Sequence, residues 1–227
     1  MINYHKNKTF IEGVALEDIA KSHSTPFYVY SQNKIEAAYK KLKETLKTEI
    51  FYAVKANSNQ AIIKLISKLG AGADVVSVGE LERVISAGMD PKKIIFEGIG
   101  KTEKDIHYAI KKNIRLINVE SINEIQLIDI IAREQKKIVD IGIRLNPNTD
   151  AETLKEISTG KKENKFGLTK KKFLELLTKY KNSKFINIIC LSVHIGSQIT
   201  SHIPYKNMLR VVNKIIRQSK YKFKFID

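Results

Sequence analysis

Residues 73–98 read ADVVSVGELERVISAGMDPKKIIFEG and contain three successive patterns. The first, ADVVS (73–77), is a short valine-rich run of the kind found in strands that are buried on both faces. GELERVISAG (79–88) spaces its apolar residues three and four apart, as an amphipathic helix does, and Gly88 suits the residue that follows a helix. KIIFEG (93–98) is a second apolar run. Strand, helix and strand in this order predict a βαβ unit with two parallel strands.

The same alternation extends along most of the chain. Seven apolar runs are expected to form strands: IFYAVK (50–55), ADVVS (73–77), KIIFEG (93–98), RLINVE (115–120), IVDIGIRLN (138–146), INIICLSVHIG (186–196) and FKFID (223–227). Amphipathic stretches between them are expected to form helices: 59–70, 79–88, 102–113, 121–135, 169–182 and 203–218. Thr102 with Asp105, and Ser121 with Glu124, mark two of the helix starts, and the second pair has capping-box spacing.

The spacing of these runs favours a particular α/β architecture. The first five start about 22 residues apart, which fits a (β/α)₈ TIM-like barrel. A doubly wound sheet is the alternative, and it requires a glycine-rich phosphate loop after the first strand. KANSN (55–59) stands there instead, so we prefer the barrel.

The ends of the chain predict an incomplete barrel domain. A closed barrel needs eight strands, and the seventh run reaches the last residue. We therefore expect residues 31–227 to form a barrel truncated near strand seven. TPFYVYS (25–31) predicts one further strand in the N-terminal segment 1–30, ahead of the helix expected over 32–46. That strand is expected to pair with a β-domain that is missing from the chain.

Composition excludes several classes of protein. Of the 227 residues, 43 % are hydrophobic and 28 % are charged, which is a globular composition and not a disordered one. Cys190 stands alone, which excludes a disulfide framework or a cysteine-rich zinc site. No apolar run approaches the roughly 20 residues that span a bilayer, and MINYHKNKTF (1–10) lacks the apolar core of a signal peptide. We therefore expect a cytoplasmic location.

A net charge of +16 raises the alternative of a nucleic-acid partner. The lysines, however, are spread along helix faces, and no arginine cluster is interleaved with aromatic residues. A lysine-rich solvated surface therefore explains the charge better, and neither a nucleic-acid nor a membrane partner is expected.

In a (β/α)₈ barrel the functional side chains lie at the carboxyl ends of the strands. The polar residues at or near these ends are Lys55, Asp74, Ser77, Glu80, Glu97, Glu120, Arg144, Asn146, His194, Ser197 and Gln198. Lys55 follows FYAV, so its stem is expected to be buried, which would make the amine a nucleophile toward aldehydes. The alternative is a lysine that only closes its strand. His194 could stack on a planar ring or transfer a proton, or simply be a core histidine.

Seven stretches together resemble the motifs of the fold-type III pyridoxal-phosphate-dependent decarboxylases, in the family's order. They are FYAVKANSN (51–59), GAGADVVSVGEL (70–81), FEGIGKT (96–102), NVES (118–121), IRLNPN (143–148), ISTGKKENKFGL (157–168) and VHIGSQI (193–199). The resemblance covers essentially the whole chain and is greatest to the family's diaminopimelate-decarboxylating members. It implies an alanine-racemase-type barrel that binds pyridoxal 5'-phosphate and decarboxylates meso-2,6-diaminopimelate to L-lysine, the last step of lysine biosynthesis.

The resemblance also implies roles for six residues. Lys55 matches the lysine that binds the cofactor covalently, Asp74 and Glu80 match acidic residues of the cofactor pocket, and Arg144 matches an arginine near it. His194 matches the histidine that stacks on the pyridine ring, and Ser197 a serine that contacts the cofactor. No metal is implied.

The chain departs from the family pattern at two places. Val78 stands where the family often has glycine, and residues 154–156 replace a His-Pro-Tyr type sequence, which bears on the substrate side of the site. The family's glycine-rich phosphate turn, its ring-nitrogen carboxylate and its β-domain with the catalytic cysteine would follow strand seven. We therefore expect this chain alone to be inactive, and the full-length enzyme to be a homodimer.

Two alternatives remain within this resemblance. Ornithine, arginine or carboxynorspermidine decarboxylases share the family's fold and cofactor. A non-catalytic pyridoxal-phosphate carrier has a similar barrel, but it should close within about 230 residues and lack the extra N-terminal strand.

Overall fold

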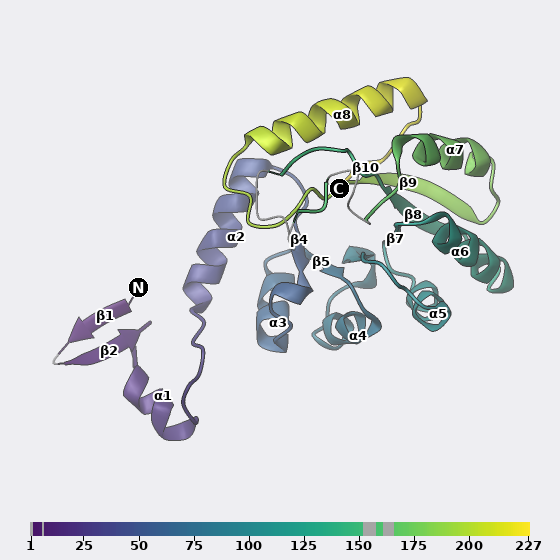
Figure 1. Cartoon of the computed structure of the whole chain (residues 1–227). Helices are drawn as coiled ribbons and strands as arrows, with labels where there is room; N and C mark the ends of the chain where they lie inside the picture. Colours follow the sequence, from purple (N-terminus) through teal and green to yellow (C-terminus); the bar gives the residue numbers. More distant parts are fainter. Residues whose placement is uncertain (1, 6, 152–157, 161–165) are drawn as a thin grey trace.

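The computed structural model describes residues 2–5, 7–151, 158–160 and 166–227, and a curled parallel sheet dominates it (Figure 1). The seven strands of this sheet are β4 (Phe51–Ala53), β5 (Gly72–Val75), β6 (Ile94–Phe96), β7 (Leu116–Val119), β8 (Val139–Arg144), β9 (Ile186–Ser192) and β10 (Phe225–Ile226). Their order in the sheet is β10-β9-β8-β7-β6-β5-β4, so chain order is kept from one edge to the other. In a doubly wound sheet the order of the strands reverses partway across the sheet, which does not happen here. The predicted truncated barrel is therefore confirmed.

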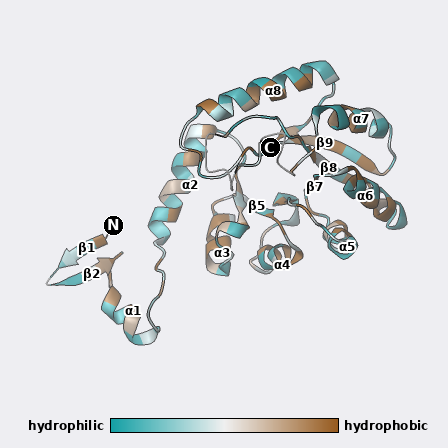
Figure 2. Ribbon diagram, in the orientation of Figure 1, coloured by the Kyte–Doolittle hydropathy of each residue, from teal (hydrophilic) through white to brown (hydrophobic). Residues whose placement is uncertain are grey.

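Helices alternate with these strands and cover the outer side of the sheet (Figure 1). They are α2 (Gln32–Leu46), α3 (Gln60–Lys68), α4 (Val78–Ser86), α5 (Glu103–Lys112), α6 (Ile122–Glu134), α7 (Lys170–Tyr180) and α8 (Ile203–Ser219), with short 3₁₀ turns η1 (Val54–Ala56) and η2 (Pro91–Lys93). Each of these seven α-helices coincides with a predicted stretch to within one or two residues. Figure 2 shows hydrophilic and hydrophobic residues on these helices, as the amphipathic pattern predicts.

The apolar faces of the helices build the main core against the sheet. Ile106 of α5, Ile125 of α6 and Phe173 of α7 are fully buried in it. Because side chains alternate along a strand, a smaller cluster forms on the inner face of the sheet. It contains Ile95, Leu116, Ile189 and Cys190, packed against Phe51 and Phe225. Cys190 is thus a core residue.

The helix starts follow the sequence with one exception. Thr102 and Asp105 exchange hydrogen bonds at the start of α5 and form a capping box. Ser121 accepts from the Glu124 N–H at 3.1 Å, but the Glu124 carboxylate accepts from Glu120 N–H rather than from Ser121 N–H. The box predicted there is therefore half correct, because the Glu124 side chain turns toward the ends of β6 and β7.

The N-terminal segment differs from the prediction. It forms a small antiparallel sheet and a helix, β1 (Ile2–His5), β2 (Lys8–Ile11), β3 (Val14–Ala15) and α1 (Leu16–Ser22), which lie apart from the parallel sheet (Figure 1). Residues 25–31 carry no strand assignment, but the strand predicted there was expected to pair with a domain that this chain does not span, so it stays a prediction. The segment has no strand partner among the described residues, and Tyr28 and Tyr30 are 91 % and 58 % exposed. Its pairing with a further domain stays a prediction.

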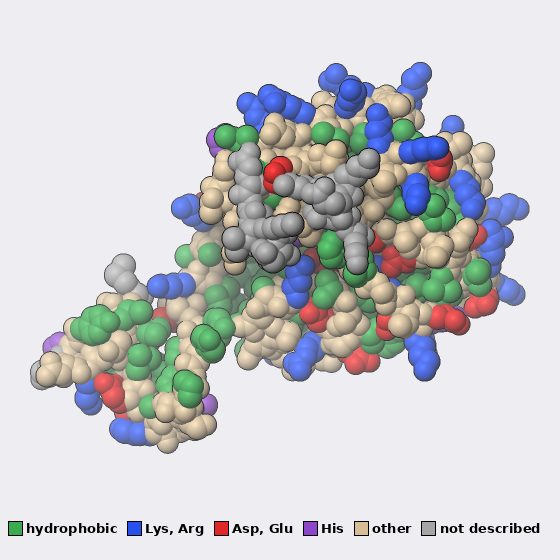
Figure 3. Space-filling model, viewed as in Figure 1, with side chains coloured by type: hydrophobic (Ala, Val, Ile, Leu, Met, Phe, Trp, Pro, Cys, Tyr) green, Lys and Arg blue, Asp and Glu red, His purple; other side chains and the backbone are tan. Residues whose placement is uncertain are grey.

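Many of the charged side chains lie on the outside of the molecule. Figure 3 shows Lys and Arg side chains spread around the periphery of one face, with Asp and Glu among them. Within the part of the chain that the structure describes, no helix is both long and apolar enough to cross a membrane.

Gly142, in the middle of β8, leaves room for a neighbouring polar side chain. A Cβ atom added at Gly142 would lie 1.7 Å from Asn118 Oδ1 on β7. Gly142→Ala should therefore lower the free energy of unfolding by about 1–3 kcal/mol, measured by urea denaturation, because the buried Asn118 must shift.

Gly79→Ala is the matched control for this substitution. Gly79 lies in α4, and the nearest heavy atom to an added Cβ is 3.9 Å away. We expect the free energy of unfolding of this variant to rise by about 0.5–1 kcal/mol, because alanine favours the helix. An unchanged stability of Gly142→Ala would contradict the tight approach of β7 and β8.

Candidate functional site

The predicted site residues gather along the carboxyl edge of the parallel sheet. Asp74 lies in β5 and Arg144 ends β8, while Glu97 and Glu120 directly follow β6 and β7. His194 comes two residues after β9. Parallel strands bring these ends together at one rim, which is the functional rim of a (β/α) barrel.

Lys55 lies in η1, directly after β4, but its side chain is exposed. The expectation of a buried stem is therefore wrong in this structure. β4 is an edge strand, paired with β5 on one side and with no strand on the other among the described residues. The rim is consequently open beside Lys55. The lysine still lies near the other residues, since its charge acts on both Asp74 and His194.

Asp74 is held in an environment that favours its protonated form. Burial, together with the neighbouring charge of Glu97, raises the pKa of Asp74 to about 7, although Lys55 and Arg144 oppose this rise. Its Oδ1 atom is buried and has no hydrogen-bond partner among the described residues. A buried polar atom without a partner marks a place where a further group could be bound.

A second partly buried carboxyl group lies beside Asp74. Glu97 Oε1 accepts hydrogen bonds from Asn118 Nδ2 and, at 3.2 Å, from Ser192 Oγ. Asn118 Nδ2 also donates to Asp227 Oδ2 at 2.9 Å. Burial and the nearby Asp227 carboxylate raise the pKa of Glu97 to about 7. The inner floor of the rim can therefore hold protons near neutral pH.

Arg144 has the carboxylate partner that a buried guanidinium requires. Its Nη1 donates to Glu120 Oε1 at 2.7 Å, and both side chains are buried. The guanidinium carbon also lies 5.2 Å from the centre of the Phe166 ring. This fixed positive charge acts on Asp74, Glu97 and His194.

His194 is uncharged at neutral pH. Although the residue as a whole is exposed to solvent, partial desolvation of the ring and the charges of Arg144 and Lys55 lower the pKa of His194 to about 4. The backbone around His194 is tied down, because Thr159 Oγ1 donates to the His194 carbonyl at 2.9 Å. Ser197 follows in the exposed turn, and its contact with the cofactor stays a prediction.

Glu80 has a local structural role as well as a place near the site. Its Oε2 accepts from Val76 N–H at 2.9 Å, and its own N–H donates to Ser77 Oγ at 3.2 Å. These bonds fix the turn from β5 into α4. The negative charge of Glu80 also contributes to the raised pKa of Asp74.

Some site residues were not singled out by sequence reasoning. Asn118 is fully buried in β7, and the signal for it was a polar residue within the apolar run LINV (116–119). Lys101 Nζ bonds Glu124 Oε1 at 2.9 Å, and the signal for it was its place in the FEGIGKT (96–102) stretch. Of the ISTGKKENKFGL motif, residues 157 and 161–165 lie outside the described residues, as do 154–156.

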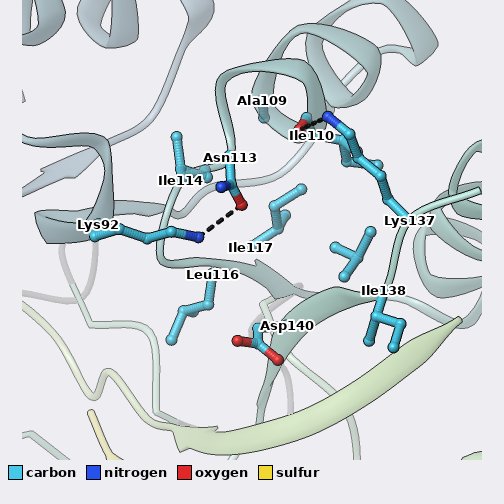
Figure 4. Close-up of a pocket in the computed structure, with 11 residues that line it drawn as sticks. Lys92, Ala109, Ile110, Asn113, Ile114, Leu116, Ile117, Lys137, Ile138 and Asp140 are labelled. Atoms are coloured by element: carbon cyan, nitrogen blue, oxygen red, sulfur yellow. Dashed lines mark hydrogen bonds between the residues drawn. The ribbon is translucent and has the colours of Figure 1, made fainter. Parts of the chain in front are cut away.

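A small pocket at the opposite end of the sheet is not part of this site. It is about 70 Å³ in volume and lies beside Leu116 at the start of β7 and Asp140 near the start of β8 (Figure 4). Lys92 Nζ donates to Asn113 Oδ1 at 2.6 Å, and Lys137 Nζ donates to the Ile110 carbonyl at 3.0 Å. Both lysines at this pocket thus already bind protein oxygen atoms.

Asp74→Asn is expected to change how stability depends on pH. The folded chain keeps a proton on Asp74 up to about pH 7, whereas an unfolded aspartate loses it near pH 4. Between these values the folded state binds more protons, so Asp74 makes the free energy of unfolding fall as pH rises. In urea titrations, the free energy of unfolding of Asp74→Asn should rise by about 1 kcal/mol or more relative to that of wild type between about pH 5 and pH 8. A pH-independent difference would contradict the raised pKa.

Comparison with known proteins indicates the same class of protein as the fold and the rim residues do. A family model described as "Pyridoxal-dependent decarboxylase, pyridoxal binding domain" matches residues 32–226. Diaminopimelate decarboxylase of Helicobacter pylori strain J99 is 43 % identical over 88 % of this chain and 50 % of that protein. The Aquifex aeolicus diaminopimelate decarboxylase is 37 % identical over 100 % of this chain and 55 % of its own length.

Solved structures agree. The crystal structure of the Helicobacter pylori diaminopimelate decarboxylase complexed with L-lysine superposes with a TM-score of 0.89 and 41 % identity, over 93 % of this chain and 55 % of that one. The M. jannaschii diaminopimelate decarboxylase, in co-complex with L-lysine, gives 0.87 and 34 %, over 99 % and 55 %. The chain spans about half the length of these relatives.

Fold and rim residues together define a cofactor-binding barrel of the (β/α) class. Within that class, the chain belongs to the family of pyridoxal-dependent decarboxylases and corresponds to its pyridoxal-binding domain. The family's cofactor is pyridoxal phosphate.

Proposed function

We propose that this chain is the cofactor-binding barrel of an enzyme that decarboxylates meso-2,6-diaminopimelate to L-lysine. The observation that carries the proposal is the family match over 32–226 together with the rim that joins Lys55, Asp74, Arg144 and His194. The relatives reported above that are named for an activity are diaminopimelate decarboxylases, which favours this substrate over ornithine, arginine or carboxynorspermidine.

The residues at the rim fit pyridoxal phosphate. Lys55 offers an exposed primary amine for covalent attachment, and Asp74 Oδ1 is a buried polar atom that lacks a partner among the described residues. A neutral His194 ring can stack on a heteroaromatic ring without adding charge. When bound, the cofactor supplies an electron-accepting ring that facilitates the loss of CO₂ from an amino acid.

Each of the protein's own residues would then have a separate role at the site. Lys55 would hold the cofactor through its primary amine. Arg144, fixed by Glu120, keeps one positive charge in place beside the pocket. Asp74 and Glu97 hold protons on carboxyl oxygens near neutral pH, so the pocket carries less negative charge than its composition indicates. The proposed roles of Glu80 and Ser197 are to line the pocket and to contact the cofactor.

Full activity is proposed to need the part of the enzyme that this chain does not span, and a homodimer is its proposed form. The test is release of labelled CO₂ from carboxyl-labelled meso-diaminopimelate in the presence of pyridoxal phosphate. We expect no release above the protein-free blank from this chain alone. Release should appear when the remaining half of the Helicobacter pylori relative is supplied as a second polypeptide.

Two controls make this test specific. Lys55→Ala in the same mixture should release no CO₂, because it removes the amine that holds the cofactor. L-Ornithine and L-arginine should be poor substrates, and preferential release from either would contradict the proposed substrate. Release by the chain alone would contradict its proposed dependence on the second half.

A further inference from the structure

Two buried ion pairs lie next to each other behind the rim. Lys101 Nζ binds Glu124 Oε1 at 2.9 Å, and these side chains are 1 % and 8 % exposed. Arg144 Nη1 binds Glu120 Oε1 at 2.7 Å, and these side chains are 9 % and 3 % exposed. Lys101 and Glu120 lie in the connections after β6 and β7, Glu124 lies in the first turn of α6, and Arg144 ends β8.

The two pairs are connected through the backbone. Glu124 Oε2 accepts from the N–H of Glu120 at 2.7 Å, so one carboxylate binds both Lys101 and the peptide that carries Glu120. Lys101 Nζ also donates to the Asn118 carbonyl at 2.8 Å and to the Gly98 carbonyl. The segment from Asn118 to Glu120 is therefore held at both ends by the Lys101–Glu124 pair.

Stability alone does not account for this arrangement. Buried ion pairs are often no more stabilising than apolar side chains of similar volume, because both charges lose their hydration. Such a pair does fix the orientation of its cation, because a guanidinium bound to a carboxylate keeps one geometry. Arg144 is the one member of the network whose charge acts on Asp74, Glu97 and His194.

We propose that Glu120 is a positioning residue for Arg144, and that the Lys101–Glu124 pair holds Glu120 in place for this task. The four residues thus act as one unit that fixes the positive charge beside the cofactor. The relevance to pyridoxal phosphate rests on the proposed function, whereas the positioning of Arg144 can be measured without it.

The direct measurement is the rotation of the Arg144 guanidinium group, followed by NMR in the ¹⁵N-arginine-labelled chain. The chain has six arginines, and Arg144→Lys assigns the signal. Glu120→Gln should speed the rotation at least tenfold. Glu124→Gln should speed it about threefold or more, because the NH2 group that replaces one carboxylate oxygen is a donor and cannot accept from Lys101 or from the Glu120 N–H.

Asp129→Asn is the matched control. Asp129 binds Arg133 Nη2 at 2.9 Å on α6, so the variant also removes a carboxylate from an arginine pair. It should speed the rotation of the Arg133 guanidinium group and leave the rotation of the Arg144 group unchanged. Should Glu120→Gln fail to fold, Glu120→Asp keeps the charge, shortens the side chain and carries the same prediction.

A parallel titration measures the apparent Kd for pyridoxal phosphate by borohydride trapping on Lys55. Glu120→Gln should weaken binding at least tenfold and Asp129→Asn less than twofold.

Unchanged Arg144 rotation in Glu120→Gln would overturn the proposal, and unchanged rotation in Glu124→Gln would remove the Lys101–Glu124 pair from it. Faster rotation with unchanged Kd would overturn its link to the cofactor. No trapping even in wild type would count against the proposed function, while the rotation would still decide the positioning.

Discussion

Lys55→Ala is expected to abolish the covalent adduct between pyridoxal phosphate and this chain at the rim. Lys55 follows β4 directly, and its charge reaches both Asp74 and His194, so its amine lies at the predicted cofactor site. Alanine removes the only nucleophilic atom of that side chain. The measurement is the absorbance of the adduct after addition of the cofactor, followed by borohydride reduction and mass spectrometry of the peptides.

Lys64→Ala is the matched control for this prediction. Lys64 is an exposed lysine on α3, the helix that follows Lys55. It should retain the full adduct, because it takes part in no rim contact of the described structure. An unchanged adduct absorbance in Lys55→Ala would remove Lys55 from its proposed role.

Lys101→Met is expected to have the largest effect on stability. The substitution leaves the Glu124 carboxylate buried without its cation, and it removes the donor to the Asn118 carbonyl. Breaking a buried pair by removing one partner typically costs about 3–5 kcal/mol. Urea denaturation of both proteins at the same pH measures the loss.

Two further variants identify the cause of that loss. Lys101→Met combined with Glu124→Gln should recover part of the stability, because the uncompensated charge is gone while an acceptor for Glu120 N–H remains. Lys40→Met, which affects a pair of 3.6 Å on the surface of α2, should change stability by about 0–1 kcal/mol. Equal losses in Lys101→Met and Lys40→Met would contradict a buried network.

The barrel could be predicted from the sequence because strand and helix have different apolar periods. The runs RLINVE and IVDIGIRLN became β7 and β8, and the stretch between them became α6. The N-terminal part could not be predicted in this way. TPFYVYS has strand composition, but a strand also needs a neighbour for its backbone hydrogen bonds, and composition does not specify one.

The site was predictable in position but not in detail. The position of Arg144 at a strand end followed from the pattern. That its partner is Glu120, and that the Lys101–Glu124 pair holds Glu120, depends on how the loops after β6 and β7 meet the start of α6 and the end of β8. The exposure of Lys55 could not be predicted either, because it depends on the open side of β4 rather than on the residues next to it.

The most direct test of the central claim is to add pyridoxal phosphate to this chain, reduce with borohydride and locate the modified residue by peptide mass mapping. The chain has 34 lysines, so the position of the label is informative. The account predicts one dominant adduct, on Lys55, at a cofactor concentration that leaves the surface lysines largely unlabelled. Labelling spread over many lysines, with Lys55 no more reactive than Lys64, would contradict it.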